Sequence, residues 1–388
     1  MKIGGKTGRG IFIVAELGTA HQGRLDEAAR LIEGAARGGA DCAKFQWVIA
    51  REILHPLTGT VKLPGGEISL FRRFQELEQP PEFYARLKEL TEAAGLAFLC
   101  SPFGLESLAG LKALGVSGVK IASPELNHLP LLEAARDLPP VILSTGVSTW
   151  EDIGRAAAIV APRPPEEPDR AILLHCVTAY PAPEADYNLK VIPRLREGFH
   201  LAAGVSDHSL DPLLVPVLSL SQGAVLVEKH FTLSRSGGGL DDPIALDPED
   251  FRRMCRALRE AEKESPSEII REMEARFGAP RIRGILGTGE KVLAKSEAAN
   301  YLSTRRSLHA LRRLPRGVRL TEKNTALLRT EKNLRVGLDP ADRPRALGRR
   351  TCRTVDSGQG ILWEDLEEAE ASPIPGIPPA GPGPQSPG

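Results

Sequence analysis

The chain lacks the features that mark several specialised classes of protein. Its 388 residues include only five cysteines, with no CxxC pair, which argues against a disulfide framework and a thiolate metal site. No apolar run approaches the about 18 residues of a membrane-spanning helix, and the N-terminus has no apolar leader segment. Fifty basic and fifty acidic residues cancel, so no overall field favours nucleic acid or a membrane surface. We therefore expect a cytoplasmic protein that acts on a small molecule.

Short β-like runs alternate with helical periodicity through the first two thirds of the chain. The alternation predicts eight strands, at 11–15, 42–45, 97–100, 119–122, 141–143, 171–176, 201–205 and 224–228, each followed by a helix. Eight such units are typical of a (β/α)8 TIM barrel, whose closed sheet leaves no edge. No GxGxxG follows the first strand, so an open dinucleotide-binding sheet has no support. We predict an α/β fold with a barrel over residues 1–285.

The sequence changes character after the last barrel helix. The segment 265–304 is charged and mixed, which favours a linker, and we place the linker proper at 286–304. Residues 305–368 hold short strand-like runs and turns, which predict a small β-rich domain. The Pro- and Gly-rich tail 369–388 has almost nothing to bury, so we expect it to be disordered.

Two polar clusters each close an apolar run between residues 203 and 231. They are Ser206-Asp207-His208 and Glu228-Lys229-His230, separated by about one helix of sequence. If both runs are parallel strands, the clusters emerge at the same end of the sheet. Neutral imidazole suits a borderline divalent metal, and two imidazoles leave coordination positions open for substrate. Either histidine alone is equally compatible with an ordinary residue at a strand end.

The other six predicted strands also end in polar residues, and the carboxyl ends of barrel strands form the active site of such folds. In chain order the strand ends supply Glu16 (with His21 beyond), Lys44 and Gln46, Ser101, then Lys120, Ser123 and Glu125, then Ser144, and finally Thr178 and Tyr180. Ammonium groups beside serine hydroxyls suit a phosphate, alone or with a carboxylate. Glu16 and Asp241, the latter in a Gly-rich loop, are candidates for proton transfer or for holding hydroxyls. These residues indicate metal-dependent carbon–carbon bond chemistry on a phosphorylated acid.

An ordered set of motifs resembles the sialic acid synthase family over roughly residues 10 to 367. The motifs are FIVAELGTAHQG, DCAKFQ, FLCSPFGLESL, VKIASPELNHLPLL, VILSTGVSTWEDI, LLHCVTAYPAP, GVSDHS and VEKHFTL, and the C-terminal region resembles that family's antifreeze-like SAF domain. The resemblance implies condensation of phosphoenolpyruvate with the open-chain aldehyde of an N-acylated mannosamine-type sugar, giving a nine-carbon 2-keto acid and phosphate. It also implies a divalent metal, Mn²⁺ first and Mg²⁺ or Co²⁺ as alternatives, and a domain-swapped homodimer.

The resemblance also assigns roles to positions of this sequence. The implied metal ligands are His208 and His230. The implied phosphoenolpyruvate contacts are Lys44, Gln46, Ser101, Lys120, Ser123, Ser144, Thr178 and Ser206, and the implied catalytic residues are Glu16, Glu125, Tyr180 and Asp241. On the sugar side the resemblance implies His21, Asp241 and Arg329, the last reaching into the partner's site.

Several departures from the family pattern fall on the sugar side. The sequence has AHQG at 20–23 in place of an NHNG-like loop, GLDDP in place of a GPDH-like loop, and no Pro-Gly-Asn-Gly beside Arg329. The acceptor therefore stays open between N-acetylmannosamine and a diacetamido-trideoxy sugar. Two further interpretations are a Schiff-base aldolase that uses Lys120 or Lys229, and a non-catalytic sugar-binding or SAF interaction protein.

Overall fold

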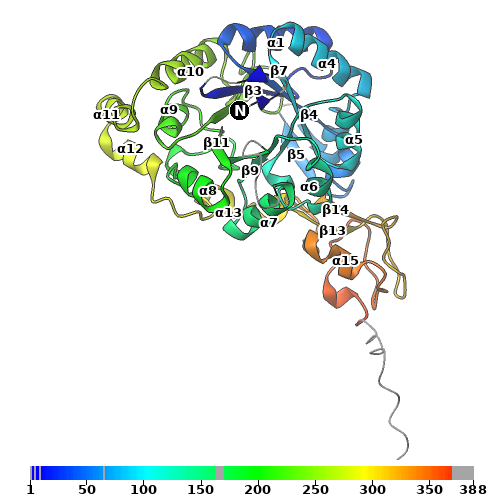
Figure 1. Ribbon diagram of the computed structural model, residues 1–388. Helices are drawn as coiled ribbons and strands as arrows, with labels where there is room; N and C mark the ends of the chain where they lie inside the picture. Colours follow the sequence, from blue (N-terminus) through cyan, green and yellow to red (C-terminus); the bar gives the residue numbers. More distant parts are fainter. Residues whose placement is uncertain (1, 4–5, 8–9, 64–65, 162–169, 369–388) are drawn as a thin grey trace, which may run out of the picture.

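The computed structural model describes residues 2–3, 6–7, 10–63, 66–161 and 170–368. Within these residues, eight parallel strands form one sheet in the order β7-β4-β3-β12-β11-β10-β9-β8. The two end strands, β7 and β8, lie side by side, so the sheet closes into a barrel (Figure 1). The strands are β3 (Phe12–Gly18), β4 (Cys42–Trp47), β7 (Ala97–Pro102), β8 (Val119–Ile121), β9 (Val141–Ser144), β10 (Ala171–Cys176), β11 (Ala202–Asp207) and β12 (Leu226–His230). The predicted barrel is confirmed.

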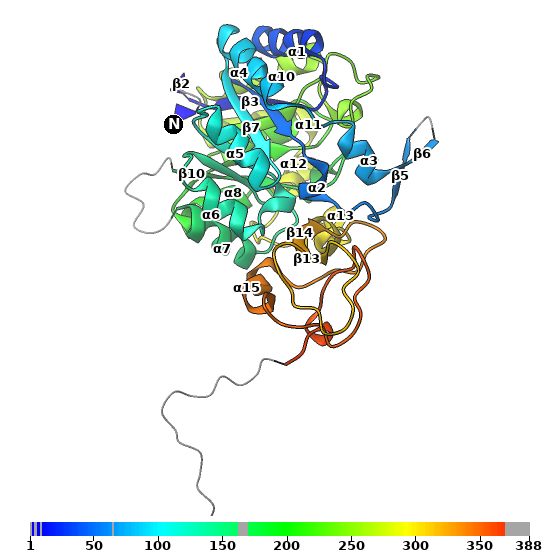
Figure 2. The same cartoon turned by 90° about the vertical axis from the view of Figure 1, so that its right-hand side faces the viewer.

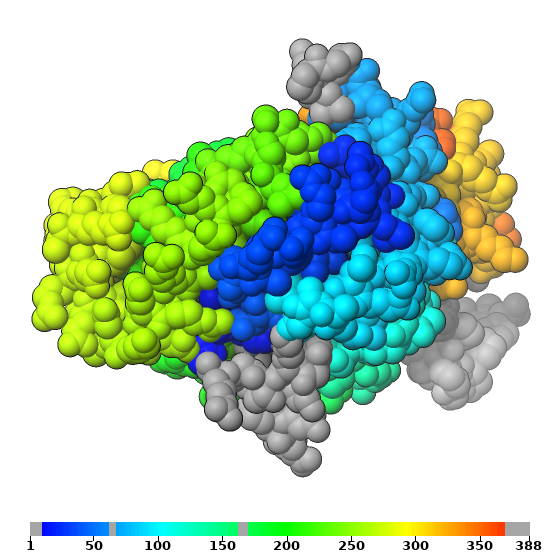
Figure 3. Space-filling view, turned by 90° about the horizontal axis from the view of Figure 1, so that it is seen from above, coloured from blue at the N-terminus to red at the C-terminus, as the bar shows by residue number. Residues whose placement is uncertain are grey.

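A ring of helices surrounds the barrel, one after each strand (Figure 1). These are α1 (Leu25–Gly38), α4 (Pro81–Ala93), α5 (Leu105–Ala113), α6 (Leu129–Ala135), α7 (Trp150–Val160), α8 (Val191–Phe199), α9 (Leu214–Ser221) and α10 (Pro248–Ala261). Figure 3 shows α1 in blue between α10 in green and α4 in cyan, which both contact it. Every helix that the sequence predicts in this ring is present, with ends shifted by a few residues.

The inside of the barrel has an apolar floor and a polar end. Inward-facing side chains of the strands form a buried cluster of their own: Phe12, Val14, Cys42, Ala97, Leu99, Ile142, Ile172, Leu174 and Leu226. Because strand side chains alternate between the two faces, the next inward positions toward the carboxyl ends are Glu16, Lys44, Ser101, Lys120, Ser144, Cys176, Ser206 and Glu228. We call these eight residues the polar layer.

Helices occupy most of the segment 265–304, whose composition favours a linker. α11 (Pro266–Phe277) and α12 (Ala279–Leu286) pack against α9. A reciprocal cap starts α11, where Glu268 N–H donates to Ser265 Oγ and Ser265 N–H donates to the Glu268 carboxylate. The charged residues of these helices lie on their solvent side, which explains why the composition of the segment favours a linker. Two short helices, α13 (Lys295–Ala298) and α14 (Tyr301–Thr304), follow.

The long connection after β4 holds α2 (Ala50–Ile53), the hairpin strands β5 (Thr60–Leu63) and β6 (Gly66–Ser69), and α3 (Leu70–Gln75). Figure 2 shows the hairpin standing out from the side of the barrel. Arg73 of α3 donates to the carbonyl oxygen of Gly238 at 3.4 Å. This connection therefore borders the Gly-rich loop that carries Asp241. A second short hairpin, β1 (Lys2–Ile3) and β2 (Lys6–Thr7), lies near the N-terminus.

Residues 305–368, the C-terminal module, have a small core of their own below the barrel (Figure 2). Strands β13 (Arg306–Ala310) and β14 (Thr325–Arg329) pair antiparallel, and further single bridges join 309 to 360, 314 to 355, 319 to 350 and 351 to 366. Ten buried apolar residues fill it: Leu308, Ala310, Leu314, Leu320, Leu327, Leu338, Ala346, Val355, Ile361 and Leu366. Its other elements are η4 (Pro340–Asp342), α15 (Arg343–Ala346) and η5 (Trp363–Asp365). The predicted small β-rich domain is confirmed.

The predicted disordered tail, 369–388, lies outside the described residues. Among the helices of the described ranges, none combines the length and the apolar character needed to cross a membrane.

Candidate active site

Two lysines of the polar layer lie on either side of one carboxylate. Glu228 Oε1 is 3.5 Å from Lys44 Nζ and 3.5 Å from Lys120 Nζ, and Ser206 Oγ donates to the same oxygen at 2.9 Å. Burial alone would raise the pKa of Glu228, but Lys120 and Lys44 lower it to about 2. Lys120 also donates to Ser144 Oγ at 2.7 Å. The two lysine side chains are therefore held by one carboxylate oxygen in the polar layer.

Glu16 and Asp241 both lie close to Gly18. Glu16 Oε2 is 2.8 Å from Lys44 Nζ, and Gln46 Nε2 donates to Glu16 Oε1 at 2.7 Å. Gly18 has φ +52°, and a Cβ there would lie 3.4 Å from Glu16, 3.2 Å from Gln46 and 3.6 Å from Asp241. A bulge lies between Glu16 and Gly18, and both carboxylates border the backbone of Gly18. Burial raises the pKa of Asp241, which suits a group that exchanges a proton.

The two predicted metal ligands are neighbours. The ring centroids of His208 and His230 are 5.5 Å apart. Val177 offers its carbonyl oxygen to His208 Nδ1 at 2.9 Å, and since a carbonyl only accepts, Nδ1 carries the proton, so that in the neutral ring the Nε2 lone pair is free. Burial alone would lower the pKa of His208, but the neighbouring Cys176 raises it above its usual value. Burial lowers the pKa of His230 to about 3, so its imidazole is neutral near pH 7.

A divalent cation fits this donor set. No cluster of three or more His, Cys, Asp or Glu side chains suited to a metal occurs among the described residues, so the protein would offer two imidazoles and leave positions for substrate or water. The polar layer sets two ammonium groups against two carboxylates, Glu16 and Glu228. An anionic substrate would therefore gain from additional positive charge.

Tyr180 covers the histidine pair. Its ring stacks on His208 at 4.3 Å between centroids and meets His230 edge-on at 6.2 Å. The side chain is 54 % exposed. Tyr180 therefore forms a wall of the site that a substrate can contact.

Ser123 and Thr178 lie beside the polar layer on neighbouring loops. Ser123 Oγ accepts the Gly146 N–H at 3.1 Å. Thr178 Oγ1 is buried and lacks a hydrogen-bond partner within the described ranges. Ser101 lies 3.5 Å from Lys44 Nζ. All predicted phosphoenolpyruvate contacts thus gather at one end of the barrel.

Glu125 is bound by two arginines of the C-terminal module. Its Oε1 accepts from Arg329 at 2.7 and 3.0 Å and from Arg306 at 2.9 and 3.2 Å. Its Oε2 is buried with no hydrogen-bond partner in the described part of the chain. The geometry suits Glu125 to hold the module and Arg329 in place, and it gives no support to the predicted proton transfer.

Lys229 and Asp207 point away from the site. Strand alternation turns both to the outer face of the barrel wall, where Lys229 Nζ lies 2.5 Å from Asp207 Oδ2 with neither side chain exposed. The predicted polar clusters are therefore split, because their residues belong to β11 and β12 and only alternate side chains face inward. Lys229 cannot serve as an amine nucleophile at this end of the barrel.

His21 also lies apart from the polar layer. Its ring packs between Phe45 and Phe83, with centroids 6.1 and 4.9 Å away, on the helix side of the barrel wall. Gly23 N–H donates to His21 Nδ1 at 3.1 Å, and burial lowers the pKa of His21 to about 4. The structure does not bring this predicted sugar contact to the site.

Three residues with contacts at this end of the barrel had no predicted role: Glu228, Cys176 and Arg306. Alternation along β12 is a signal for Glu228, since it shares a face with His230. Cys176 lies 3.9 Å from His208 Nδ1. Arg306 is fully buried and binds Glu125 from 181 residues away in the chain, a separation for which the sequence has no local signal.

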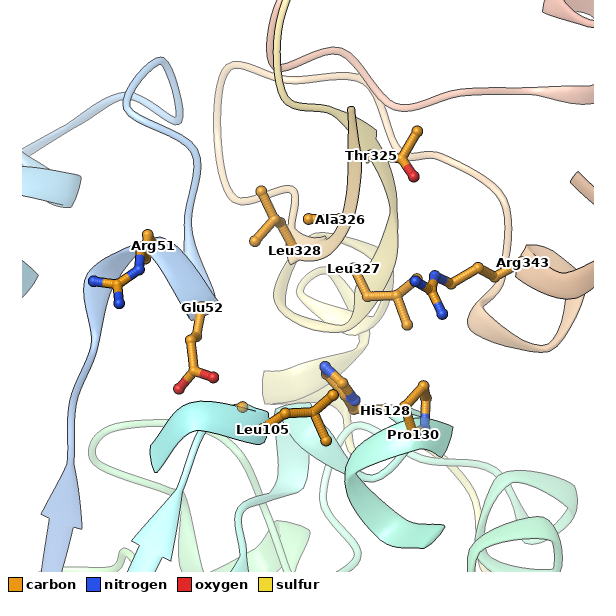
Figure 4. Close-up of a pocket in the computed structure, with 11 residues that line it drawn as sticks. Arg51, Glu52, Leu105, His128, Pro130, Thr325, Ala326, Leu327, Leu328 and Arg343 are labelled. Carbon is orange, nitrogen blue, oxygen red and sulfur yellow. The ribbon is translucent and has the colours of Figure 1, made fainter. Parts of the chain in front are cut away.

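A separate cavity of about 280 Å³ lies between the barrel and the C-terminal module (Figure 4). Leu327 and Leu328 of β14 line one side and Arg51 and Glu52 of α2 another. The Glu52 carboxylate is already bound by the backbone N–H groups of Glu106 and Ser107. This cavity belongs to the contact between the two parts of the chain, away from the polar layer.

A comparison with models of protein families finds a match within the barrel part of the chain. The model of the NeuB family matches residues 31–269, which include the strand ends from β4 to β12.

Individual relatives match over most of their length. The N,N'-diacetyllegionaminic acid synthase of Legionella pneumophila is 31 % identical over 363 residues, covering 92 % of this chain and 94 % of the relative. The crystal structure of the spore coat polysaccharide biosynthesis protein SpsE from Bacillus subtilis has a TM-score of 0.76 and 32 % identity, over 93 % of this chain and 96 % of that one. An N-acetylneuraminic acid (sialic acid) synthetase from Leptospira borgpetersenii, solved with citrate, has a TM-score of 0.59 and 30 % identity, covering 75 % and 90 %.

Proposed function

The chain belongs to the NeuB family, and from that membership we propose that it is a nonulosonic acid synthase. It condenses phosphoenolpyruvate with the open-chain aldehyde of an N-acylated amino sugar and releases phosphate. The observation that carries the proposal is the polar layer, where Lys44 and Lys120 share Glu228 on the strand that also holds His230. Relatives named as acid synthases of this type support it.

The polar layer suits the anionic substrate. Lys44 and Lys120 would bind the phosphate and carboxylate of phosphoenolpyruvate, and the hydroxyls of Ser123 and Ser144 would donate to the same oxygens. Ser206 would donate there only by giving up its hydrogen bond to Glu228. Thr178 Oγ1, buried without a partner in the described residues, is a further donor for this ligand. Burial of the lysines strengthens the attraction because the surrounding dielectric is low.

The reaction forms one carbon–carbon bond and breaks one carbon–oxygen bond. The C3 carbon of phosphoenolpyruvate attacks the aldehyde carbon, and the carbonyl oxygen becomes an alkoxide that takes up a proton. Water adds at C2 and gives up a proton, and the tetrahedral intermediate expels inorganic phosphate to leave the 2-keto acid. Glu16 and Asp241, which both lie close to Gly18, are the candidates for these two proton transfers.

We propose that His208 and His230 hold a divalent cation, Mn²⁺ before Mg²⁺ or Co²⁺. Such a cation would supply Lewis acidity toward the aldehyde oxygen and positive charge beside the anionic substrate. The free Nε2 of His208 and the neutral ring of His230 support this assignment. The carbonyl of Val177 would keep the His208 ring in its ligating orientation.

The acceptor would lie between Tyr180 and the Glu125–Arg329 pair. Arg329 can direct a guanidinium N–H group at an N-acyl oxygen while Glu125 holds the rest of it in place. We propose an N-acylated mannosamine-type sugar as acceptor, with a diacetamido-trideoxy sugar as the alternative. Relatives named for a legionaminic and a neuraminic acid both align along most of the chain, so similarity does not choose between the two acceptors. Identifying the acid that the enzyme forms would choose between them.

We further propose a cytoplasmic homodimer that exchanges its C-terminal modules. In the single chain Arg329 binds Glu125 of its own barrel. Domain swapping exchanges identical elements between copies, so the same contact would form between two chains. We also propose that the C-terminal module is an antifreeze-like SAF domain.

The test is a product assay with phosphoenolpyruvate and a panel of N-acylated hexosamines, followed by phosphate release and mass analysis of the acid. We expect activity to be lost after EDTA treatment and restored by MnCl₂. Phosphate release at background with every sugar would refute the synthase and favour a sugar-binding protein.

The second candidate function is a Schiff-base aldolase that uses Lys120 as its nucleophile, because burial lowers the pKa of this amine. Such an enzyme would retain activity in EDTA, and borohydride would trap the sugar acid on Lys120. We expect neither result, since Lys120 is engaged by Ser144 and Glu228.

A further inference from the structure

Glu297, in the short helix α13 between barrel and module, binds two loops at the end of the barrel. Its Oε2 accepts the Val147 N–H at 3.0 Å and the Thr178 N–H at 2.8 Å. The first follows β9 and the second follows β10. The carboxylate is 1 % exposed, so water competes little for these bonds.

Both loops carry residues of the proposed active site. Thr178 itself offers Oγ1, and the preceding carbonyl, of Val177, orients His208. On the other loop the Gly146 N–H donates to Ser123 Oγ. A Cβ on Gly146 would lie 2.2 Å from Thr178 Oγ1, so the loops touch, and a shift of one must move the other.

The loop after β9 has a backbone conformation that needs external support. Val147 has φ +41°, a region that β-branched residues rarely adopt. Its N–H is the group that Glu297 binds. The carboxylate therefore fixes a strained peptide at the edge of the anion site.

The helix that carries Glu297 is itself fixed to the barrel. Ser296 N–H donates to Asp186 Oδ2 at 3.0 Å, and Glu297 Oε1 accepts the N–H of Ala294 at 3.2 Å. The first of these bonds joins α13 to the barrel, and the second holds the carboxylate against the start of its own helix.

We infer that Glu297 is a positioning residue that clamps the loops after β9 and β10 and thereby sets the phosphoenolpyruvate and metal sites. The inference rests on the proposed synthase function for its consequence in catalysis, while the clamp itself is a matter of structure. It assigns the segment between barrel and module a part in building the active site.

Hydrogen exchange and kinetics of Glu297→Ala and Glu297→Gln test the clamp, with Glu290→Ala as control because that carboxylate is exposed in the same segment. We expect faster amide exchange in peptides covering Val147 and Thr178 for Glu297→Ala, and less so for Glu297→Gln, which keeps one carbonyl acceptor. The KM for phosphoenolpyruvate and the half-saturating MnCl₂ concentration should rise by about 10- to 100-fold in Glu297→Ala, as for other groups that orient ligands. The control should match the native protein in each measurement.

Unchanged exchange at both loops in either Glu297 variant would overturn the clamp. Faster exchange with an unchanged KM would overturn its role at the site. If Glu297→Ala does not fold, Glu297→Gln decides both points. Failure of the synthase function itself would appear in the native protein, as no thermal stabilisation by phosphoenolpyruvate with MnCl₂, and exchange would still report the clamp.

Discussion

Arg329 of β14 donates two hydrogen bonds to Glu125 Oε1, at 2.7 and 3.0 Å, across 204 residues of chain. The Arg329 side chain is only 11 % exposed and Glu125 is fully buried. Arg306 shares the same oxygen. One carboxylate at the end of β8 therefore joins the barrel to the module and directs a guanidinium toward the Tyr180 side of the site.

Replacing Arg329 should weaken sugar binding far more than phosphoenolpyruvate binding. Arg329→Ala removes charge-assisted hydrogen bonds, and we expect kcat/KM for the sugar to fall by about 10- to 100-fold. Arg329→Lys should recover only part of this, because an ammonium group cannot make the two-pronged contact. Steady-state kinetics with each substrate varied in turn measures both effects. Arg313→Ala, at an exposed position of the module, should behave as the native enzyme.

Mixing inactive chains shows whether the module acts on its own barrel or on a partner's. Arg329→Ala and His208→Ala chains, unfolded together and refolded, should recover some activity if modules are exchanged, since one site then has both native residues. The control is the native protein taken through the same unfolding and refolding. If it regains activity and the mixture does not, Arg329 serves only the barrel of its own chain.

The buried pair of Asp207 and Lys229 should matter for stability and leave catalysis alone. Lys229→Met strands a carboxylate and Asp207→Asn strands an ammonium group, so each should lower the free energy of unfolding by about 3–5 kcal/mol. The double variant should lose less than the sum of the two. Denaturant unfolding measures the cycle, and the folded variants should keep the native kcat. Loss of turnover in folded Lys229→Met would contradict the outward placement of this amine.

His128 provides a test of pH dependence. Burial, then Arg306, lowers its pKa to about 3, below the unfolded value of about 6.5. The neutral ring therefore contributes stability above pH 6.5, which is lost as pH falls toward the folded pKa, by about 1.4 kcal/mol per unit. His128 Nδ1 accepts the Leu131 N–H at 3.1 Å, and asparagine can cap a helix in the same way.

His128→Asn should accordingly lose about 2 kcal/mol less stability than the native chain between pH 7 and pH 5. Urea unfolding at both pH values measures the difference. Equal losses in the two proteins would show that the imidazole of His128 is not held neutral.

The sequence was sufficient for the barrel and for six of the eight residues of the polar layer, all except Cys176 and Glu228. Alternating strands and helices have a strong period, and the period of two along a strand decides which side chains face inside. Lys44, Lys120 and Ser206 were predicted from their place at the ends of strands, and this period explains why they face inside. The same rule, applied beyond the predicted strand ends, would have separated Asp207 and Lys229 from His208 and His230.

The contacts of the segment between barrel and module could not be predicted. Glu297 lies in α13 and Arg306 begins β13, and both bind barrel residues that are far away in the chain, so no local pattern encodes these pairs. His21 shows a similar limit, because the bulge at Gly18 changes the direction of the chain before it. The helices α11 and α12 were not predicted because each has only a narrow apolar stripe, and the charged residues of the outer face hide its helical period in the sequence.

Close packing at Gly146 gives the last prediction. A methyl group there would lie 2.2 Å from Thr178 Oγ1, 3.0 Å from Ser123 Oγ and 3.3 Å from Cys176 Sγ. Gly146→Ala should therefore push the loops after β9 and β10 apart, lower stability by about 1–3 kcal/mol and raise the KM for phosphoenolpyruvate. Thr178→Ala in the same chain removes the closest atom and should restore part of the stability. As a control, Gly284→Ala, at a helix position with open space around it, should be neutral or stabilising. Thermal unfolding of the native protein, the two single variants and the double variant measures these effects. A Gly146→Ala protein as stable as the native one would contradict the close packing.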